Sequence, residues 1–326
     1  MIVPATPDNI AEAGKRLKNG DLVAFPTETV YGLGADATSD TAVARIFAAK
    51  NRPDFNPLIV HVPDLNTAAT LAEFTALGQK IAERFWPGPM SLVLRRKSDC
   101  PVSHLAAAGL ETIAVRVPAN ATAQAILGAA GVPIAAPSAN ASGKISPTEA
   151  AHVQESLGDA VDRIIDDGPC LVGLESTVVD CTLKTPVVLR PGGVTSEQIE
   201  SIAGSVAVSD KSPDKPASPG MLQSHYAPDA AIRLNATSVD VEEALLSFGA
   251  HRLSDIGMER NLSPTANLQE AAANLFKMLR ELDAAAGRIA VMPIPDRGLG
   301  RAINDRLQRA ATPKNQRLTP LPEDHT

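Results

Sequence analysis

Short apolar runs alternate with amphipathic segments along most of the chain, and this alternation limits the fold more than any other feature of the sequence. Runs rich in β-branched residues, such as PLIVHV at 57–62, are expected to be strands. Segments with apolar residues three and four positions apart, such as SDTAVARIFAAK at 39–50, are expected to be helices. Continuous apolar strands next to helices predict an α/β fold whose sheet is partly buried on both faces.

The first two-thirds of the chain holds most of these elements. One helix there has clear end signals, because Thr6 can cap it, Pro7 suits its first turn and Gly20 can end it. This helix is expected to span 6–20. Further strands are expected at 22–25, 90–96, 112–118, 132–137, 162–167, 176–182 and 186–190, and further helices at 76–86, 121–127 and 146–158.

The segment 206–229 separates the chain into two parts. It contains four prolines, several serines and alternating charges, so we predict a linker between a first domain at 1–205 and a second domain at 230–326. In the second domain, strands are expected at 231–234 and 288–295, and helices at 239–248, 263–287 and 298–311.

The composition excludes several kinds of protein. A hydrophobic fraction of 44% and a charged fraction of 21% are ordinary for a soluble globular protein. A net charge of −7 and an aromatic fraction of 3% argue against a protein that holds nucleic acid by itself. We expect a cytoplasmic protein, since no apolar run is long enough to span a membrane and the first residues lack the pattern of a secretory signal. Cys100, Cys170 and Cys181 lack metal-site spacing and are expected to be reduced and structural.

No common catalytic motif is complete. HExxH and GxSxG are absent, and GKIS at 143–146 lacks the earlier glycine of a P-loop. Polar and charged residues instead gather at or near the ends of the expected strands: Thr27, Glu28, Thr29, Tyr31, Lys50, Arg52, His61, Arg116, Ser138, Asn140, Ser176 and Arg190.

Arg116 is the most unusual of these residues. It lies within IAVRV, where an unpaired cation would be costly, so it is expected to meet an anion. Lys50 and Arg52 are expected in an extended stretch, where residues two apart point the same way. Each feature also has a plainer explanation, as a core histidine, a helix-end lysine or a capping hydroxyl. Taken together, they favour a cleft that holds a carboxylate and phosphates.

The stretch FPTETVYGLGADATSD at 25–40 follows a buried strand with a polar, glycine-containing segment. Pro26 is expected to end the strand, and Gly32 and Gly34 are expected to let the backbone turn close to a ligand. Thr29 is expected to face the cleft. Three residues of the stretch could be either wall or ligand: Thr27, Glu28 and Tyr31.

Seven segments, in order, resemble the YrdC-like family. They are FPTETVYGLGADA, KNRPDFNPLIVHV, FWPGPMSLVL, TIAVRVP, APSANASGKISPT, ESTVVD and LRPGGVT, and they include the KxR at Lys50 and Arg52 and the SxN at Ser138 and Asn140. The segment SPGMLQSHYAP and the unit after it resemble the long, two-domain form of the family. The resemblance implies a twisted, open mixed sheet with helices, followed by a smaller Rossmann-like α/β domain.

The resemblance also implies an activity. Proteins of this form are nucleotidyltransferases that convert L-threonine, bicarbonate or CO2, and ATP into threonylcarbamoyl-AMP and pyrophosphate. A separate threonylcarbamoyl-transferring complex then modifies tRNA, so tRNA is implied only as an indirect partner. Mg²⁺ would come bound to the ATP phosphates, and no metal site on the protein is implied.

The site residues carried over from the family fall into two groups. Threonine would be held by Thr29, His61, Arg116, Ala136 and Ser176. ATP would be held by Arg52, Asn56, Thr112, Ser138, Asn140, Ser146, Arg190 and Tyr226, with Thr148 as an alternative to Ser146. The assignment of Lys50, Ser138 and Asn140 to ATP or to threonine stays open. Lys50 and Arg52 would neutralise the phosphates as the catalytic pair, and the linker would close over the site as a lid.

Three other functions stay open from the sequence alone. One is a tRNA or double-stranded RNA binding module that uses the concave face, against which the acidic net charge weighs. Another is a carbamoyl-transferring or hydrolytic enzyme of the hydrogenase-maturation type, but the cysteine spacing lacks that group's zinc finger. The third is a regulatory protein with a YrdC-like domain, against which the intact KxR and SxN motifs argue.

Overall fold

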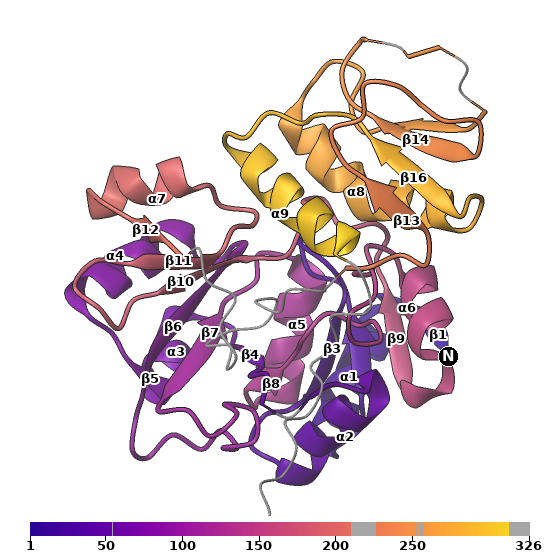
Figure 1. Ribbon diagram of the computed structural model, residues 1–326. Helices are drawn as coiled ribbons and strands as arrows, with labels where there is room; N and C mark the ends of the chain where they lie inside the picture. The colour runs from indigo at the N-terminus through magenta and orange to yellow at the C-terminus, as the bar shows by residue number, and fades with distance from the viewer. Residues whose placement is uncertain (54, 210–225, 252, 255–256, 313–326) are drawn as a thin grey trace, which may run out of the picture.

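Two β-sheets organise the computed structural model, which describes residues 1–53, 55–209, 226–251, 253–254 and 257–312 (Figure 1). Within these residues, a 12-stranded mixed sheet has the order β1-β9-β2-β3-β8-β4-β7-β6-β10-β11-β12, with β5 paired to β6 off this path. A 4-stranded sheet follows, in the order β13-β16-β14-β15, and its pairs are all parallel. The predicted α/β fold with a second, smaller α/β unit is confirmed.

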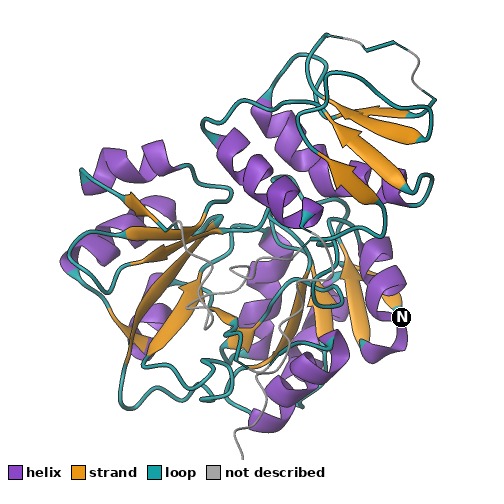
Figure 2. Cartoon of the chain, in the orientation of Figure 1, coloured by secondary structure: helices purple, strands orange, loops and turns teal. Residues whose placement is uncertain are grey.

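Figure 2 shows that helices lie beside the strands in each of the two units. The strands of the first sheet are β1 (Ile2–Pro4), β2 (Val23–Phe25), β3 (Gly32–Asp36), β4 (Ile59–His61), β5 (Ala72–Glu73), β6 (Met90–Arg96), β7 (Thr112–Arg116), β8 (Ile134–Ala135), β9 (Arg163–Asp166), β10 (Thr177–Asp180), β11 (Val187–Arg190) and β12 (Ala207–Val208). The helices of the first unit are α1 (Pro7–Lys18), α2 (Asp40–Lys50), α3 (Leu65–Leu71), α4 (Ala76–Phe85), α5 (Ala121–Ala130), α6 (Ala150–Leu157), the 3₁₀ helix η1 (Gly158–Ala160) and α7 (Ser196–Ala203). The second unit contains β13 (Ala231–Arg233), β14 (Glu243–Ser247), β15 (Glu259–Asn261), α8 (Leu268–Asp283), β16 (Arg288–Val291) and α9 (Leu299–Ala311).

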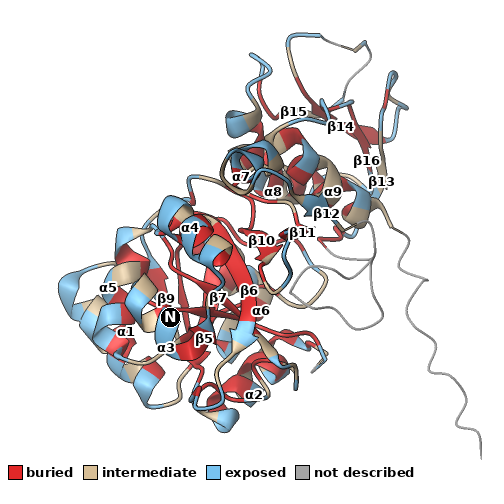
Figure 3. Ribbon diagram, turned by 90° about the vertical axis from the view of Figure 1, so that its left-hand side faces the viewer, coloured by how far each residue is buried: buried red, intermediate tan, exposed pale blue. Residues whose placement is uncertain are grey.

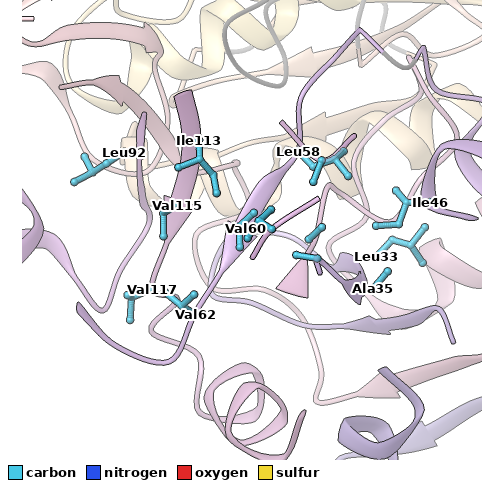
Figure 4. Close-up of a cluster of buried hydrophobic side chains, with 14 of the residues drawn as sticks. Leu33, Ala35, Ile46, Leu58, Val60, Val62, Leu92, Ile113, Val115 and Val117 are labelled. Atoms are coloured by element: carbon cyan, nitrogen blue, oxygen red, sulfur yellow. The ribbon is translucent and has the colours of Figure 1, made fainter. Parts of the chain in front are cut away.

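Alternation along the central strands gives the first sheet two different faces. Val60 and Val115 enter the main hydrophobic cluster, in which Leu92 and Ile113 also lie (Figure 4). Because side chains alternate between the faces of a strand, the neighbours of these residues point to the other side. There Ile59 belongs to a separate small cluster. The same face therefore carries the polar side chains of β4 and β7.

The second unit packs on the first through its helices. In Figure 1, α8 and α9 lie between the sheet of the second unit and the first unit. A shared hydrophobic cluster joins them, containing Val30, Ile145 and Leu174 from the first unit and Leu275 and Phe276 from α8. Figure 3 shows buried residues running through both units. The two units therefore share buried apolar surface.

Three predicted elements were wrong in part. The helix expected at 239–248 is the strand β14, in which all five residues are buried between two parallel neighbours. A short apolar run fits a buried strand as well as a helix, and the sheet decides between them. The helices expected to begin at Ser-Pro steps begin later. Asn267 caps α8 by accepting from the Gln269 and Glu270 amides, while α6 begins at Ala150.

Other differences concern short elements. Thr6 caps α1 as predicted, since its side chain accepts from the Asn9 amide. Strand β12 occupies part of the segment predicted as the linker, and most of that segment, 210–225, lies outside the described residues. The elements that we did not predict are β1, β3, β5, β12, β15, α3, η1 and α7.

Candidate active site

A cavity opens on the polar face of the first sheet, and it encloses about 510 Å³ of space when the open solvent at its mouth is counted. It is lined by Thr27, Thr29, Val30, Gly32, Arg52, Ile59, His61, Arg116, Ala136, Pro137, Ser138, Glu175, Ser176, Arg190 and Tyr226. Segments far apart in the sequence meet there, as the predicted convergence of strand ends requires.

The loop after β2 presents hydroxyl groups to this cavity. The Thr27 hydroxyl donates to the Val30 carbonyl at 2.7 Å, and it lies 2.7 Å from the Thr29 hydroxyl. Since a hydroxyl has one proton, Thr29 donates in the second bond and keeps acceptor lone pairs. Thr29 is therefore suited to bind a hydrogen-bond donor. Tyr31 points elsewhere, because its hydroxyl donates to the Gly168 carbonyl at 2.8 Å.

Gly32 and Gly34 do not form the predicted turn. Both lie in β3 and neither has a positive φ. They allow close packing instead, because a Cβ on Gly34 would lie 2.6 Å from the Phe25 ring and one on Gly32 would lie 3.3 Å from the Ala136 Cβ. Gly32 also lines the cavity, so its missing side chain leaves space there.

Arg116 meets the anion that its buried position requires. Its Nη2 donates to Glu28 Oε1 at 2.6 Å, and its Nε donates to the Gly88 carbonyl at 3.3 Å. The other Glu28 oxygen accepts from the Ala119 amide at 3.1 Å. Glu28 is thus the buried partner of Arg116. The sequence left Glu28 open as wall or ligand, and in the structure its carboxylate pairs with Arg116.

His61 is buried on the same face, 3% exposed. Burial, and then the nearby Arg116 charge, lower the pKa of His61 from 6.5 to about 3, so the ring is neutral near pH 7. Its Nδ1 lies 3.2 Å from the Ile59 carbonyl, which can only accept. Nδ1 therefore carries the proton, and Nε2 is the acceptor.

Arg52 and Arg190 place two buried cations on the cavity wall. Arg52 donates through Nε to the Asn56 carbonyl at 3.2 Å and through Nη2 to the Pro57 carbonyl at 2.9 Å. Arg190 donates through Nη2 to the Ser176 carbonyl at 2.8 Å and hydroxyl at 3.2 Å. Burial, and next the positive charge of Arg190, lower the pKa of Arg52. The two guanidinium groups therefore repel each other across the cavity.

Lys50 lies behind the wall and does not line the cavity. It is buried, and its ammonium donates to the Ser138 carbonyl at 2.5 Å and to the Asn140 carbonyl. The predicted extended stretch is wrong, because Lys50 is the last residue of α2 and Asn51 ends the helix with a φ of 49°. Lys50 thus holds the SxN loop in place, whereas Arg52 faces the cavity.

Several other predicted ligands also lie outside the lining. Asn56 meets Arg52 through its carbonyl, and the Asn140 side chain donates to the Ala141 and Lys144 carbonyls. Thr112 begins β7, four residues before Arg116, which is about 13 Å along a strand. The predicted residues that do line the cavity are Thr29, Arg52, His61, Arg116, Ala136, Ser138, Ser176, Arg190 and Tyr226.

Two charged residues that we did not predict lie in the wall or directly behind it. Glu175 lines the cavity, and its Oε1 accepts from the Ser146 hydroxyl at 2.5 Å. Its Oε2 accepts from Arg306 Nε at 2.9 Å, and Arg306 is fully buried in α9. The signal for Arg306 was its spacing, because it lies three residues after Ile303 and four after Ala302 on the apolar face of a helix.

Tyr226 joins the cavity to the second unit. Its ring stacks on Phe276 with centroids 5.6 Å apart, and the Arg306 guanidinium lies 5.1 Å from the ring centroid. Its φ of 62° lies in the left-handed region, which is costly for a residue with a side chain. The second unit therefore holds this ring at the cavity.

Known proteins match this chain over almost its whole length. A family model for Sua5, YciO and YrdC proteins, described as "Telomere recombination", matches residues 15–192. A second model, described as "Threonylcarbamoyl-AMP synthase, C-terminal domain", matches residues 194–312. The threonylcarbamoyl-AMP synthase of Bacillus subtilis is 41% identical over 93% of this chain and 92% of its own length. The chain belongs to the threonylcarbamoyl-AMP synthase family. The YrdC-like resemblance and the predicted class of enzyme, a nucleotidyl-transferring synthase, are confirmed.

A further sequence match and a structural match come from Pyrococcus abyssi. Its threonylcarbamoyl-AMP synthase is 41% identical over 90% of this chain and 92% of its own length. A crystal structure of the P. abyssi protein Sua5 in complex with L-threonine has a TM-score of 0.89 and 37% identity, covering 95% of this chain and 97% of that one. The two-unit fold described above is thus the fold of this family.

Three further observations concern the cysteines, metal binding and membrane spans. The cysteines are free thiols and buried, as predicted, and burial raises the pKa of Cys170 and of Cys181 to about 12. Among the described residues, no group of three or more His, Cys, Asp or Glu could hold a metal ion. In that same part of the chain, no helix is long and apolar enough to cross a membrane.

Proposed function

We propose that this cavity makes threonylcarbamoyl-AMP from L-threonine, CO2 or bicarbonate, and ATP. The observation that carries the proposal is the pair of buried arginines, Arg52 and Arg190, on one cavity wall. Two buried like charges are unfavourable until an anion lies between them, and a nucleotide phosphate fits that need. The relative of known structure that binds L-threonine supports the other half of the site.

The chemistry asks the protein mainly to position its substrates. The amine of threonine adds to CO2 and loses a proton, which gives a carbamate. A carbamate oxygen attacks the α-phosphorus of ATP, and the bond to pyrophosphate breaks. No covalent enzyme intermediate is needed, so charge neutralisation and alignment provide the catalysis. In this proposal Mg²⁺ enters with the ATP phosphates as part of the substrate.

The threonine side of the cavity is assigned from hydrogen-bonding capacity. Within the described residues, the bonds of Arg116 use Nε and Nη2, so we assign its Nη1 to the threonine carboxylate. Thr29 Oγ1 and His61 Nε2 are acceptors, and they suit the ammonium or hydroxyl group of the substrate. Ala136 and Ser176 complete the proposed subsite.

The nucleotide side is assigned to Arg52, Ser138, Arg190 and Tyr226, which line the cavity. Lys50 is assigned a supporting role, since its ammonium is bonded to the loop that contains Ser138. Contacts of Asn56, Thr112, Asn140 and Ser146 (or Thr148) with ATP stay predictions. So does closure by the linker, most of which lies outside the described residues.

The proposal also covers the partner that consumes the product and the location of the protein in the cell. The product is a reactive mixed anhydride, so a threonylcarbamoyl-transferring complex must consume it. tRNA would then be met only through that complex, which agrees with the net charge of −7. The cytoplasm stays the predicted location.

The test is to incubate the protein with ATP, Mg²⁺, bicarbonate and threonine, and to measure pyrophosphate and threonylcarbamoyl-AMP. Both products should depend on threonine. Arg52→Ala should lower the rate by about 100-fold or more, since a preorganised cation is lost. Arg45→Ala is the matched control and should keep full activity, since Arg45 is a half-buried arginine of α2 that pairs with Asp162 away from the cavity lining.

Two results would contradict the proposal. Release of pyrophosphate without threonine would point to another acceptor. An inactive protein that binds tRNA with a strong salt dependence would favour the RNA-binding alternative instead.

A further inference from the structure

Arg306 is a fully buried arginine that belongs to the second unit but reaches the wall of the cavity. Its Nε donates to Glu175 Oε2 at 2.9 Å and its Nη1 donates to Asp305 Oδ2 at 2.6 Å. Glu175 lies in the first unit, 131 residues earlier in the chain. A buried charge is costly unless it is paired, so this contact is a strong constraint between the two units.

The carboxylate of Glu175 connects this arginine to the proposed nucleotide subsite. One oxygen is held by Arg306 and the other by the Ser146 hydroxyl. The next residue, Ser176, is bonded to Arg190 through its carbonyl and its hydroxyl. Glu175 also feels the positive charge of Arg190. Burial raises the pKa of Glu175, but Arg306, Arg190 and the Ser146 bond outweigh it, so the group is ionised.

The position of this carboxylate matters for phosphate binding. An ionised carboxylate that lost its cation would be drawn to the next cation within reach, because charges interact strongly when water is excluded. Arg190 is that cation, since it contacts the neighbouring residue and lines the same cavity. A carboxylate moved toward Arg190 would oppose the binding of a triphosphate.

We propose that Arg306 is a positioning residue for the nucleotide: it holds Glu175 against Ser146 at the domain interface, so that Arg190 serves the phosphates. The second unit thereby supplies one charge to the network formed by Arg306, Glu175, Ser146 and Arg190. This inference rests on the proposed function for the identity of the anion. It adds a role for the second unit that does not involve the linker.

Four variants test the proposal: Arg306→Met, Glu175→Gln, the double variant, and Arg301→Met as the control. Arg301 is also in α9 and also pairs with the first unit, through Glu197, but both side chains are well exposed. ATP affinity is measured by calorimetry, KM for ATP and for threonine by turnover, and folding by thermal melting. Calorimetry needs no turnover, so it reports on the inference even if the product is not threonylcarbamoyl-AMP.

We expect the variants to change ATP affinity much more than the KM for threonine, and to differ from one another. Arg306→Met should weaken ATP binding by about tenfold or more, because it leaves a buried carboxylate without its cation. The KM for threonine should change by less than about threefold, since Arg116, Thr29 and His61 of the threonine subsite do not contact this network and only Ser176 borders it. Glu175→Gln should leave ATP affinity at or above that of the unchanged protein. The double variant should recover most of the loss, and Arg301→Met should stay within about twofold, as exposed pairs contribute little.

Equal losses of ATP affinity in Arg306→Met and in the double variant would overturn the proposal. Unchanged ATP affinity in a folded Arg306→Met protein would overturn it as well. If Arg306→Met does not fold, Glu175→Gln decides, and a tenfold loss of ATP affinity in that variant would overturn the proposal. An unchanged protein that binds ATP but forms no threonylcarbamoyl-AMP would reject the proposed function while leaving the role of Arg306 measurable. A protein that binds no ATP would overturn both.

Discussion

At the scale of single residues, two of the buried arginines at the site already have carboxylate partners within the protein. Arg116 is paired with Glu28, and Glu175 is paired with Arg306. The burial of Arg116 within an apolar strand was readable from the sequence. Its partner was not, because Glu28 lies 88 positions away and only the packed sheet brings the two together.

The Arg116 pair separates a structural role from a binding role. Arg116→Met should lower the free energy of unfolding by about 3–5 kcal/mol, because it leaves Glu28 buried without its cation. Adding Glu28→Gln removes that stranded charge, so stability should partly return, measured by denaturant unfolding.

The KM for threonine should stay high in both of these proteins, since each lacks the arginine. Glu28→Gln alone is the control and should keep threonine binding. An Arg116→Met protein with the ordinary KM for threonine would remove Arg116 from the carboxylate site.

The lowered pKa of His61 predicts how the free energy of unfolding depends on pH. Its pKa is about 3 in the folded protein and ordinarily 6.5, so between these values the unfolded chain binds the extra proton. The contribution of His61 to stability is therefore complete above about pH 6.5 and is lost as the pH falls toward 3.

Unfolding free energies of the unchanged protein and of His61→Gln, measured from pH 8 to pH 4, check this expectation. The advantage of the unchanged protein should shrink steadily below pH 6.5. A constant difference across that range would mean that His61 is not buried in its neutral form.

At the scale of elements, periodicity predicted most helices and strands of the first unit but missed how closely they approach. Helices α1 and α5 cross at Gly14, where an added Cβ would lie 2.6 Å from the Ala129 backbone. Gly128, also in α5, is exposed and has nothing within 4 Å of such an atom. Both are helical glycines in the sequence, and only the packing distinguishes them.

These two glycines give opposite predictions for the same substitution. Gly128→Ala should raise the free energy of unfolding by about 0.5–1 kcal/mol, because alanine is the better helix former. Gly14→Ala should lower it by about 1–3 kcal/mol, since the added methyl group forces the two helices apart. Urea unfolding of both variants tests the pair. A stabilised Gly14→Ala protein would contradict the close crossing of α1 and α5.

At the scale of the whole molecule, the second unit is part of the site and of the core. The hydrophobic cluster shared by the two units and the buried Arg306 contact join them. Gly173 marks a close approach between them, because a Cβ there would lie 2.5 Å from the Ala273 Cα of α8. The two units should therefore unfold together.

Calorimetry should show one unfolding transition for the unchanged protein. Gly173→Ala should lower its midpoint and separate the units into two transitions, because the methyl group has no room at the interface. Gly168→Ala is the matched control: its φ of 77° is also in the left-handed region but its surroundings are open, so it should cost only about 1–2 kcal/mol of backbone strain. Equal effects of the two substitutions would mean that the interface is not closely packed.

The amino-acid sequence by itself determined the α/β class, the family and most residues that line the cavity, because these follow from local periodicity and from motifs whose residues lie close together in the chain. The tertiary structure decided which charges meet. It placed Lys50 behind the wall and Arg52 in it, turned 243–247 into a strand between parallel neighbours, and brought Arg306 to Glu175 across 131 residues. Burial and pairing depend on contacts between distant segments, and no local pattern in the sequence encodes them.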